Sequence, residues 1–217
     1  VANGQKAWTI DGLADALNTL PLNQPTITVG PGGGHEVPFP GDGVLAQLAQ
    51  AGRRTMLLEG KVAIITGAGR GLGKAMARVF AREGALVLAV DISGAENAVA
   101  AEIGPAIVPF HADVGREAEI EAMFAFALER FGRVDVLVNN AATLMGLRPE
   151  VTAEEYEEGT AVNLRGLMLC CKYAIRAMAA SGGGSIVNVT TAGVFGIEDR
   201  ASIVYSEPNT AVHPLTQ

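Results

Sequence analysis

The feature that most constrains this chain is a strand-like run that ends in a cluster of glycines, between Val62 and Gly73. Apolar and β-branched residues lead into Gly67, Gly71 and Gly73, and apolar residues at helical spacing follow them. This pattern predicts a buried parallel strand, a tight turn and the start of a helix. Glycine allows a sharp turn and the close approach of a phosphate, while a helix N-terminus supplies free N–H groups and a positive dipole end. We therefore expect a phosphate-binding loop at this turn.

An acidic residue after the next strand-like run indicates which phosphate compound binds. Residues 86–90 are apolar and are followed by Asp91, where dinucleotide-binding folds carry the acid that binds the adenosine ribose. A glycine cluster alone is a weak signal, but one set between two such runs is specific. A carboxylate here repels a 2′-phosphate, so NAD is predicted over NADP, although Arg70 favours NADP weakly. The alternative is that Asp91 caps a helix ahead of Ser93 and Gly94.

Apolar patterning between residues 60 and 191 alternates between strand and helix. This alternation predicts an α/β fold, namely a Rossmann-like, doubly wound parallel sheet with helices on both faces. Right-handed crossovers then give the strand order third, second, first, fourth, fifth. The predicted strands lie near residues 62–66, 86–90, 106–110, 134–138 and 185–190, and the predicted helices near 71–83, 95–102, 116–131, 153–165 and 167–180.

Composition and charge argue against several classes of protein. The 217 residues carry a net charge of −7 without a block of basic residues, which argues against a nucleic-acid or anionic-membrane partner. The apolar runs are short and no secretory leader is visible, so no membrane span and a cytoplasmic location are expected. The adjacent Cys170 and Cys171 are predicted to be reduced thiols, because neighbours on a helix do not readily pair. The scattered histidines share no ligand spacing, so no metal site is predicted.

Several motifs follow one another in the chain: Thr66-Gly67-x3-Gly71-x-Gly73, Asp113-Val114 after the third predicted strand, Asn139-Asn140-Ala141 after the fourth, Asn163, the segment 185–191, and Tyr205. Taken in this order, from about residue 58 to residue 217, they resemble the motifs of the short-chain dehydrogenase/reductase family. The resemblance implies NAD as cofactor. It implies cofactor-binding positions at Gly67, Arg70, Gly71, Leu72, Gly73, Asp91, Ile92, Asp113, Val114, Asn140, Ala141 and Ala142.

The resemblance also implies a catalytic set, and this chain departs from it at one position. In the family, a tyrosine acts as general acid or base, a lysine lowers its pKa, a serine binds the substrate oxygen and an asparagine positions a water. The matching residues are Tyr205, Asn209 in place of the lysine, Thr191 in place of the serine, and Asn163. A free phenol has a pKa of about 10 and needs nearby positive charge to work at neutral pH, so Asn209 predicts weak activity. Pro208 also disfavours the helix that the tyrosine and lysine normally share.

Residues 1–57 differ in composition from the rest of the chain. They are predicted to be an N-terminal extension or linker, because residues 21–43 are rich in proline and glycine. Residues 1–12 resemble the last strand of the family, whereas the domain at 58–217 lacks the usual C-terminal end. Circular permutation, a fragment of a tandem pair, and coincidence in a short motif all stay open as explanations. A displaced strand at residues 5–10 should pair in a parallel sheet.

The predicted function is hydride transfer between NAD(H) and a small alcohol or carbonyl substrate. The alternative is a catalytically impaired NAD-binding homologue, or a fragment, with a scaffolding or regulatory role, and Asn209 favours that alternative. The resemblance further implies a homo-oligomer, either a dimer or a tetramer, built on the helices near 116–131 and 153–180.

Overall fold

The computed structural model describes residues 56–143, 151–191, 209–212 and 214–216. The chain divides into two compact units, Val1–Leu57 and Leu58–Gln217. Nearly all of the first unit lies outside the described residues. The extension at 1–57 and the displaced strand at 5–10 therefore stay predictions, and the account below concerns the second unit.

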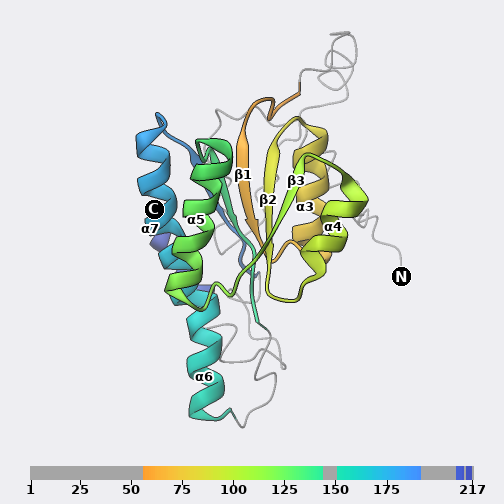
Figure 1. Ribbon diagram of the computed structural model, residues 1–217. Coiled ribbons are helices and arrows are strands. Elements are labelled where there is room, and N and C mark those ends of the chain that lie inside the picture. The colour runs from red at the N-terminus through yellow and green to blue at the C-terminus, as the bar shows by residue number, and fades with distance from the viewer. Residues whose placement is uncertain (1–55, 144–150, 192–208, 213, 217) are drawn as a thin grey trace, which may run out of the picture. The chain divides into compact units, whose positions relative to one another are not determined.

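The second unit is built on a five-stranded parallel sheet with the order β3-β2-β1-β4-β5 (Figure 1). In this sheet Ile64 lies in register with Leu88 on one side and Leu137 on the other. The order confirms the predicted one, and the α/β class is likewise confirmed. The strands are β1 (Val62–Thr66), β2 (Leu86–Asp91), β3 (Ile107–His111), β4 (Val136–Asn139) and β5 (Ser185–Asn188).

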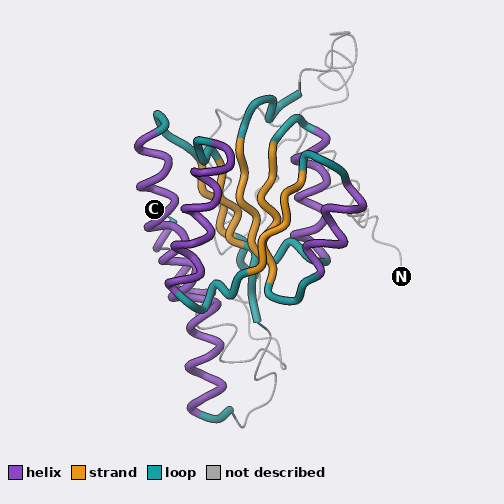
Figure 2. The backbone as a smooth tube through the Cα atoms, viewed as in Figure 1, coloured by secondary structure: helices purple, strands orange, loops and turns teal. Residues whose placement is uncertain are grey.

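Helices cover both faces of the sheet. Figures 1 and 2 show α3 and α4 against one face and α5 and α7 against the other. One prediction needs correction: the helix expected at 153–165 ends as an α-helix at Thr160 and continues as a π-helix, η1 (Ala161–Gly166). The α-helices are α3 (Gly71–Arg82), α4 (Ala95–Ile103), α5 (Glu117–Phe131), α6 (Ala153–Thr160) and α7 (Leu167–Ala180).

Alternate residues of each central strand enter two separate cores. Ile64 packs in the core shared with Ile120 of α5, while its neighbour Ile65 packs in the core shared with Ala77 of α3. All five residues of β1 are buried. A strand covered on both faces needs apolar side chains at successive positions, which explains why its sequence is a continuous apolar run rather than an alternating one.

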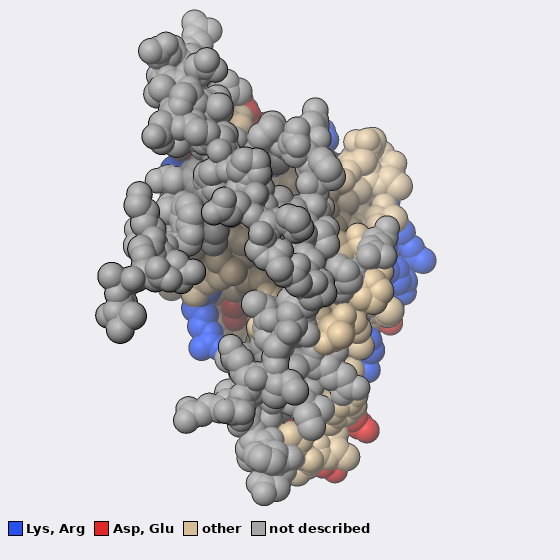
Figure 3. Space-filling view, turned by 180° about the vertical axis from the view of Figure 1, so that it is seen from behind, with Lys and Arg blue, Asp and Glu red and all other residues tan. Residues whose placement is uncertain are grey.

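Two surface properties bear on partners. Within the described residues, no helix combines the length and the apolar character needed to cross a membrane. On the face shown in Figure 3, the visible Lys and Arg side chains lie in small separate groups.

The fold brings the ends of β1, β2 and β4 to one edge of the sheet. After β1 the chain passes to β2 on one side, and β4 pairs with β1 on the other, so β1 and β4 flank the point where the winding direction reverses. Doubly wound sheets bind ligands at the carboxyl edge beside this point. The glycine cluster, which follows β1, lies there.

Candidate functional site

Gly67 and Gly73, two of the glycines after β1, are required by close packing. Gly67 has a φ of +65°, and a Cβ on it would lie 2.9 Å from the Cα of Ala141. A Cβ on Gly73 would lie 2.0 Å from the carbonyl oxygen of Gly67, which no side chain tolerates. Gly71 differs, because its φ is +53° but the space beside it is open. The loop therefore folds tightly on itself while leaving room at its middle glycine.

Helix α3 offers its N-terminus to that open space. Arg70 is the N-cap residue, and no side chain of the described residues caps the first turn, which also contains no acidic residue. The helix has 12 residues, so its dipole is fully developed. Free N–H groups beside a glycine turn suit a phosphate, and this turn therefore fits the pyrophosphate of a dinucleotide.

Thr66 and Asn140 hold the glycine loop in place. The buried Thr66 hydroxyl donates to the carbonyl of Val138 and accepts from the backbone N–H groups of Asn140 and Ala141, at 3.3, 3.0 and 3.1 Å. The Asn140 amide returns two hydrogen bonds, to the carbonyls of Thr66 at 3.0 Å and Gly67 at 3.2 Å. These contacts join the ends of β1 and β4. The sequence analysis assigned no role to Thr66, although a polar residue directly before the first glycine was a usable signal.

Asp91 lies beside the glycine loop and accepts hydrogen bonds on both oxygens. Oδ2 accepts the N–H of Gly69 at 2.8 Å, and Oδ1 accepts the N–H and the hydroxyl of Ser93 at 2.9 and 2.6 Å. Burial raises the pKa of this carboxyl, but the hydrogen bonds from Ser93 and Gly69 and the charge of Arg70 outweigh burial and lower the pKa below its usual value. Asp91 is therefore ionised at neutral pH.

The alternative role for Asp91 as a helix cap is wrong. The N-cap residue of α4 is Gly94, which has a φ of +81°, and no side-chain hydrogen bond caps this helix. Asp91 instead closes a turn with Ser93 and contacts the glycine loop. Its neighbour Ile92 is exposed.

The loop after β3 packs against the π-helix. Val114 is buried, and a Cβ on Gly166 of η1 would lie 2.2 Å from its carbonyl oxygen. The Arg165 guanidinium donates to the carbonyl of Gly115 at 2.9 Å. Asp113 accepts the N–H of Gly115 at 2.8 Å, which fixes the turn. The adenine contact assigned to Asp113 and Val114 stays a prediction.

Asn163 is buried within η1 and ties this helix to the segment after β4. Its amide nitrogen donates to the carbonyl of Thr143 at 3.0 Å, and its amide oxygen accepts the N–H of Thr143 at 2.9 Å. Ala141 and Ala142 therefore lie on a segment held at both ends, by Thr66 and by Asn163. A π-helical turn widens the backbone spacing, and such turns are frequent at functional sites. Sequence periodicity carried no sign of this turn.

The position predicted for a lysine is occupied by a buried amide. Asn209 is 6% exposed. The hydroxyl of Thr190 lies 3.0 Å from its Oδ1 and 3.2 Å from its backbone oxygen. Thr191 follows directly after Thr190 and is partly buried. Tyr205 lies outside the described residues, so the structure places Asn209 against Thr190, the neighbour of Thr191, and does not place the tyrosine.

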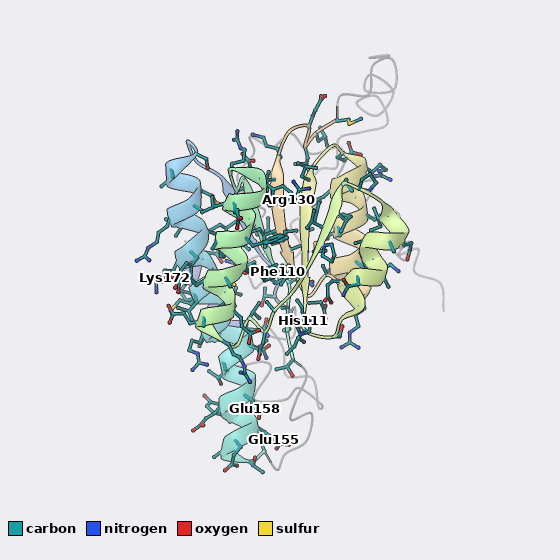
Figure 4. The ribbon with its side chains drawn as sticks, in the orientation of Figure 1. Phe110, His111, Arg130, Glu155, Glu158 and Lys172 are labelled. Atoms are coloured by element: carbon teal, nitrogen blue, oxygen red, sulfur yellow. The ribbon has the colours of Figure 1, made fainter. Side chains whose placement is uncertain are left out.

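No lysine in the described part of the chain replaces the missing charge. Lys61 pairs with Asp135, Lys74 with Glu102, and Lys172 with Glu117, at 3.7, 2.6 and 2.7 Å. Figure 4 shows Lys172 on the side of α7 that faces away from the sheet.

A polar cluster that the sequence analysis missed joins the ends of β4 and β5. The Asn139 amide nitrogen donates to the side-chain oxygen Oδ1 of Asn188 at 2.9 Å and to the Cys171 sulfur at 3.3 Å. The Asn188 amide donates to the hydroxyl of Thr216 at 3.1 Å, which connects the cluster to the last described residues. These partners lie far apart in sequence, so only the sheet register reveals them.

Both cysteines are free thiols, as predicted. Burial raises the pKa of Cys170 to about 12 and also raises that of Cys171. Neither is therefore a reactive thiolate at neutral pH. Among the residues that the structure describes, no three His, Cys, Asp or Glu side chains group as metal ligands.

Comparison with known proteins identifies the family. Residues 61–217 match the model of the family described as short chain dehydrogenase, so the chain belongs to the short-chain dehydrogenase family. It is 43% identical over 167 residues to a sorbitol dehydrogenase of Cereibacter sphaeroides, covering 75% of this chain and 64% of that one. It is 42% identical over 140 residues to a galactitol 2-dehydrogenase of Agrobacterium fabrum, covering 63% of this chain and 54% of that one. The chain thus spans less than two thirds of the length of these relatives.

Solved structures agree with the family. A 3-ketoacyl-(acyl-carrier-protein) reductase from Brucella melitensis, complexed with NADH, superposes with a TM-score of 0.67 at 39% identity. The match covers 73% of this chain and 68% of that one. A levodione reductase superposes with a TM-score of 0.69 at 32% identity, covering 73% and 64% of the two chains.

Proposed function

We propose that this chain is an oxidoreductase that transfers a hydride between NAD(H) and a small alcohol or carbonyl substrate. The observation that carries the proposal is the tight glycine loop that is hydrogen-bonded, through Gly69, to the ionised carboxylate of Asp91. One element fits a pyrophosphate and the other fits a ribose, and they lie side by side at the carboxyl edge of the sheet. Relatives named as polyol dehydrogenases and a structural neighbour complexed with NADH support the same function.

The glycine loop and Asp91 would hold the phosphate and ribose parts of the cofactor. The backbone N–H groups at Gly71, Leu72 and Gly73 open the helix α3, and anions bind well at such a start. Asp91 would accept a ribose hydroxyl and repel a 2′-phosphate, because its lowered pKa keeps it charged. We therefore propose NAD rather than NADP as the cofactor.

Tyr205, Thr191 and Asn163 would handle the proton and the substrate oxygen. The nicotinamide, when bound, supplies or accepts the hydride. Tyr205 would exchange the proton with the substrate oxygen, Thr191 would donate a hydrogen bond to that oxygen, and Asn163 would position a water. Because Asn209 carries no charge, the Tyr205 phenol would keep a pKa near its free value of about 10, and activity should rise toward alkaline pH.

Titration with NADH and NADPH, followed by cofactor fluorescence, tests this proposal. The unmodified protein should bind NADH more tightly, and Asp91→Ala should relax the preference roughly tenfold or more, as expected when a charge–charge repulsion is removed. Glu158→Ala is the matched control, because Glu158 is an exposed carboxylate on α6 (Figure 4). Equal or tighter NADPH binding would refute the cofactor preference. Failure to bind either nucleotide would refute the proposed function and would leave, of the alternatives, only a fragment with a scaffolding or regulatory role.

We also propose that the protein is a cytoplasmic homo-oligomer, either a dimer or a tetramer. Leu128 of α5 and Met168 and Ile175 of α7 are exposed large apolar side chains on the two long helices. Exposed apolar side chains of this size are ones that an interface between copies would bury. Light scattering at several protein concentrations measures the mass, and a monomer at all concentrations would contradict the proposal.

A further inference from the structure

Ser93 is the most closely engaged neighbour of Asp91. Its hydroxyl lies 2.6 Å from Oδ1 of Asp91, and its backbone N–H donates to the same oxygen at 2.9 Å. The serine side chain is nevertheless exposed to solvent. A hydroxyl that approaches a carboxylate so closely donates its proton to it, which leaves the hydroxyl oxygen as an acceptor.

The acceptor sites of Asp91 are nearly filled. A carboxylate offers about four acceptor positions, two on each oxygen. Ser93 fills both positions on Oδ1, and the N–H of Gly69 fills one on Oδ2. Gly69 leaves no room for rearrangement, because a Cβ on it would lie 2.9 Å from both Cγ and Oδ2 of Asp91. One free position stays on Oδ2.

A ribose presents two hydroxyl donors to this carboxylate, which can accept only one of them as it stands. The Ser93 oxygen supplies the second acceptor. Its proton points to Asp91, and the N–H of Ala95 approaches its oxygen only at the long distance of 3.4 Å. This leaves an exposed lone pair on the hydroxyl oxygen, directly beside the Asp91 carboxylate.

We propose that Ser93 and Asp91 together form the ribose-binding unit, with Oδ2 of Asp91 accepting one ribose hydroxyl and Oγ of Ser93 accepting the other. This inference rests on the proposed function and names a specificity-determining residue for it. NADP carries one ribose hydroxyl fewer than NAD and can give a proton to only one of the two acceptors, so the pair discriminates against NADP by a missing donor as well as by charge. The unit spans the glycine loop, the end of β2 and the start of α4.

The test uses Ser93→Ala, with Ser93→Thr as the conservative variant and Ser181→Ala as the control. Ser181 donates to backbone carbonyls at the end of α7 and is unconnected with Asp91. The probes are NADH, adenosine 5′-monophosphate, and its 2′-deoxy and 3′-deoxy analogues, measured by calorimetry or fluorescence. Because Ser93 is exposed, Ser93→Ala should keep its fold, which a thermal melt verifies.

Ser93→Ala should weaken adenosine monophosphate binding by about three- to tenfold, the usual effect of one lost hydrogen bond. It should leave one of the two deoxy analogues unaffected, because that analogue already lacks the hydroxyl that Ser93 accepts. Ser93→Thr should restore most of the affinity, and Ser181→Ala should change nothing. An equal loss for all three adenylates, or no loss, would overturn the inference. If no adenylate and no NADH binds to the unmodified protein, the proposed function fails instead, so the two failures are distinguishable.

Discussion

The two ends of the candidate site differ in how well they fit hydride-transfer chemistry. At the β1–β2 end, the glycine loop, Gly69 and the ionised Asp91 form a connected unit that suits a dinucleotide. At the β5 end, the residue in the lysine position is Asn209, a buried amide that Thr190 contacts. The proposed function thus assigns cofactor binding and turnover to separate parts of the chain, and a change in one need not abolish the other.

The largest effect is expected in the glycine loop, where a side chain in place of Gly73 should not be tolerated. Gly73→Ala should destabilise the protein by about 3 kcal/mol or more and abolish NADH binding, because its Cβ would lie 2.0 Å from the backbone oxygen of Gly67. Denaturant unfolding and NADH titration measure the two effects. Gly71→Ala is the matched control, and it should cost about 1 kcal/mol, since only its positive φ is unfavourable. Similar values for the two variants would contradict the packing argument.

The second prediction concerns the β5 end, where a lysine would supply the positive charge that Asn209 lacks. The double change Pro208→Ala with Asn209→Lys should raise alcohol oxidation at neutral pH by tenfold or more, because one unit of tyrosine pKa corresponds to about 1.4 kcal/mol. Either single change should raise the activity less. Pro208→Ala alone adds no charge, and Asn209→Lys alone leaves Pro208, which disfavours the helix. NADH absorbance across pH is the measurement, and the unmodified protein should grow more active toward alkaline pH. Robust turnover by the unmodified chain at neutral pH would show that another group replaces the lysine.

The smallest effect is expected at Asp135, which lies at the edge of the sheet opposite the candidate site. Asp135 lies at the opposite end of β4, where its carboxylate accepts the N–H of Val62 and the guanidinium of Arg133, each at 2.9 Å. Asp135→Asn should lower the free energy of unfolding by about 1–2 kcal/mol at pH 7, the range for weakened buried hydrogen bonds. NADH binding should be unchanged, and a large loss of affinity would show that the two edges are coupled.

The stability contribution of Asp135 should also depend on pH. Burial raises its pKa, but the contacts with Arg133, Val62 and Lys61 outweigh burial and lower the pKa below the ordinary value of 3.8. The stabilisation is therefore fully present above pH 3.8 and is lost as the pH falls through the lowered pKa of the folded state. The stability difference between Asp135→Asn and the unmodified protein should shrink over that acid range, as urea unfolding at several pH values measures.

The sheet could be predicted from the sequence because a strand that is buried on both faces has a continuous run of apolar residues. The order of the strands followed from chain handedness, and the glycine loop from the spacing of Gly67, Gly71 and Gly73. The π-helix could not be predicted, because one extra residue per turn over so short a segment leaves no periodic signal.

The contacts between elements could not be predicted from the sequence either. The hydrogen bonds of Thr66 with Asn140, and of Asn139 with Asn188, depend on the register between strands that are distant along the chain. Asp91 was found because it ends an apolar run, whereas its link to Gly69 needed the fold. Tyr205 lies outside the described residues, so its catalytic role stays a prediction.

The hydrogen bonds that Thr66 and Asn140 make around the glycine loop have a consequence for the kinetics of cofactor capture. A flexible phosphate loop must lose conformational entropy when its ligand arrives, and this loss is subtracted from the affinity. Here the loop backbone is already held from both β1 and β4, so that entropy is lost when the protein folds. A dinucleotide would then meet a preorganised surface, and its association would be limited by diffusion and orientation rather than by rearrangement of the loop.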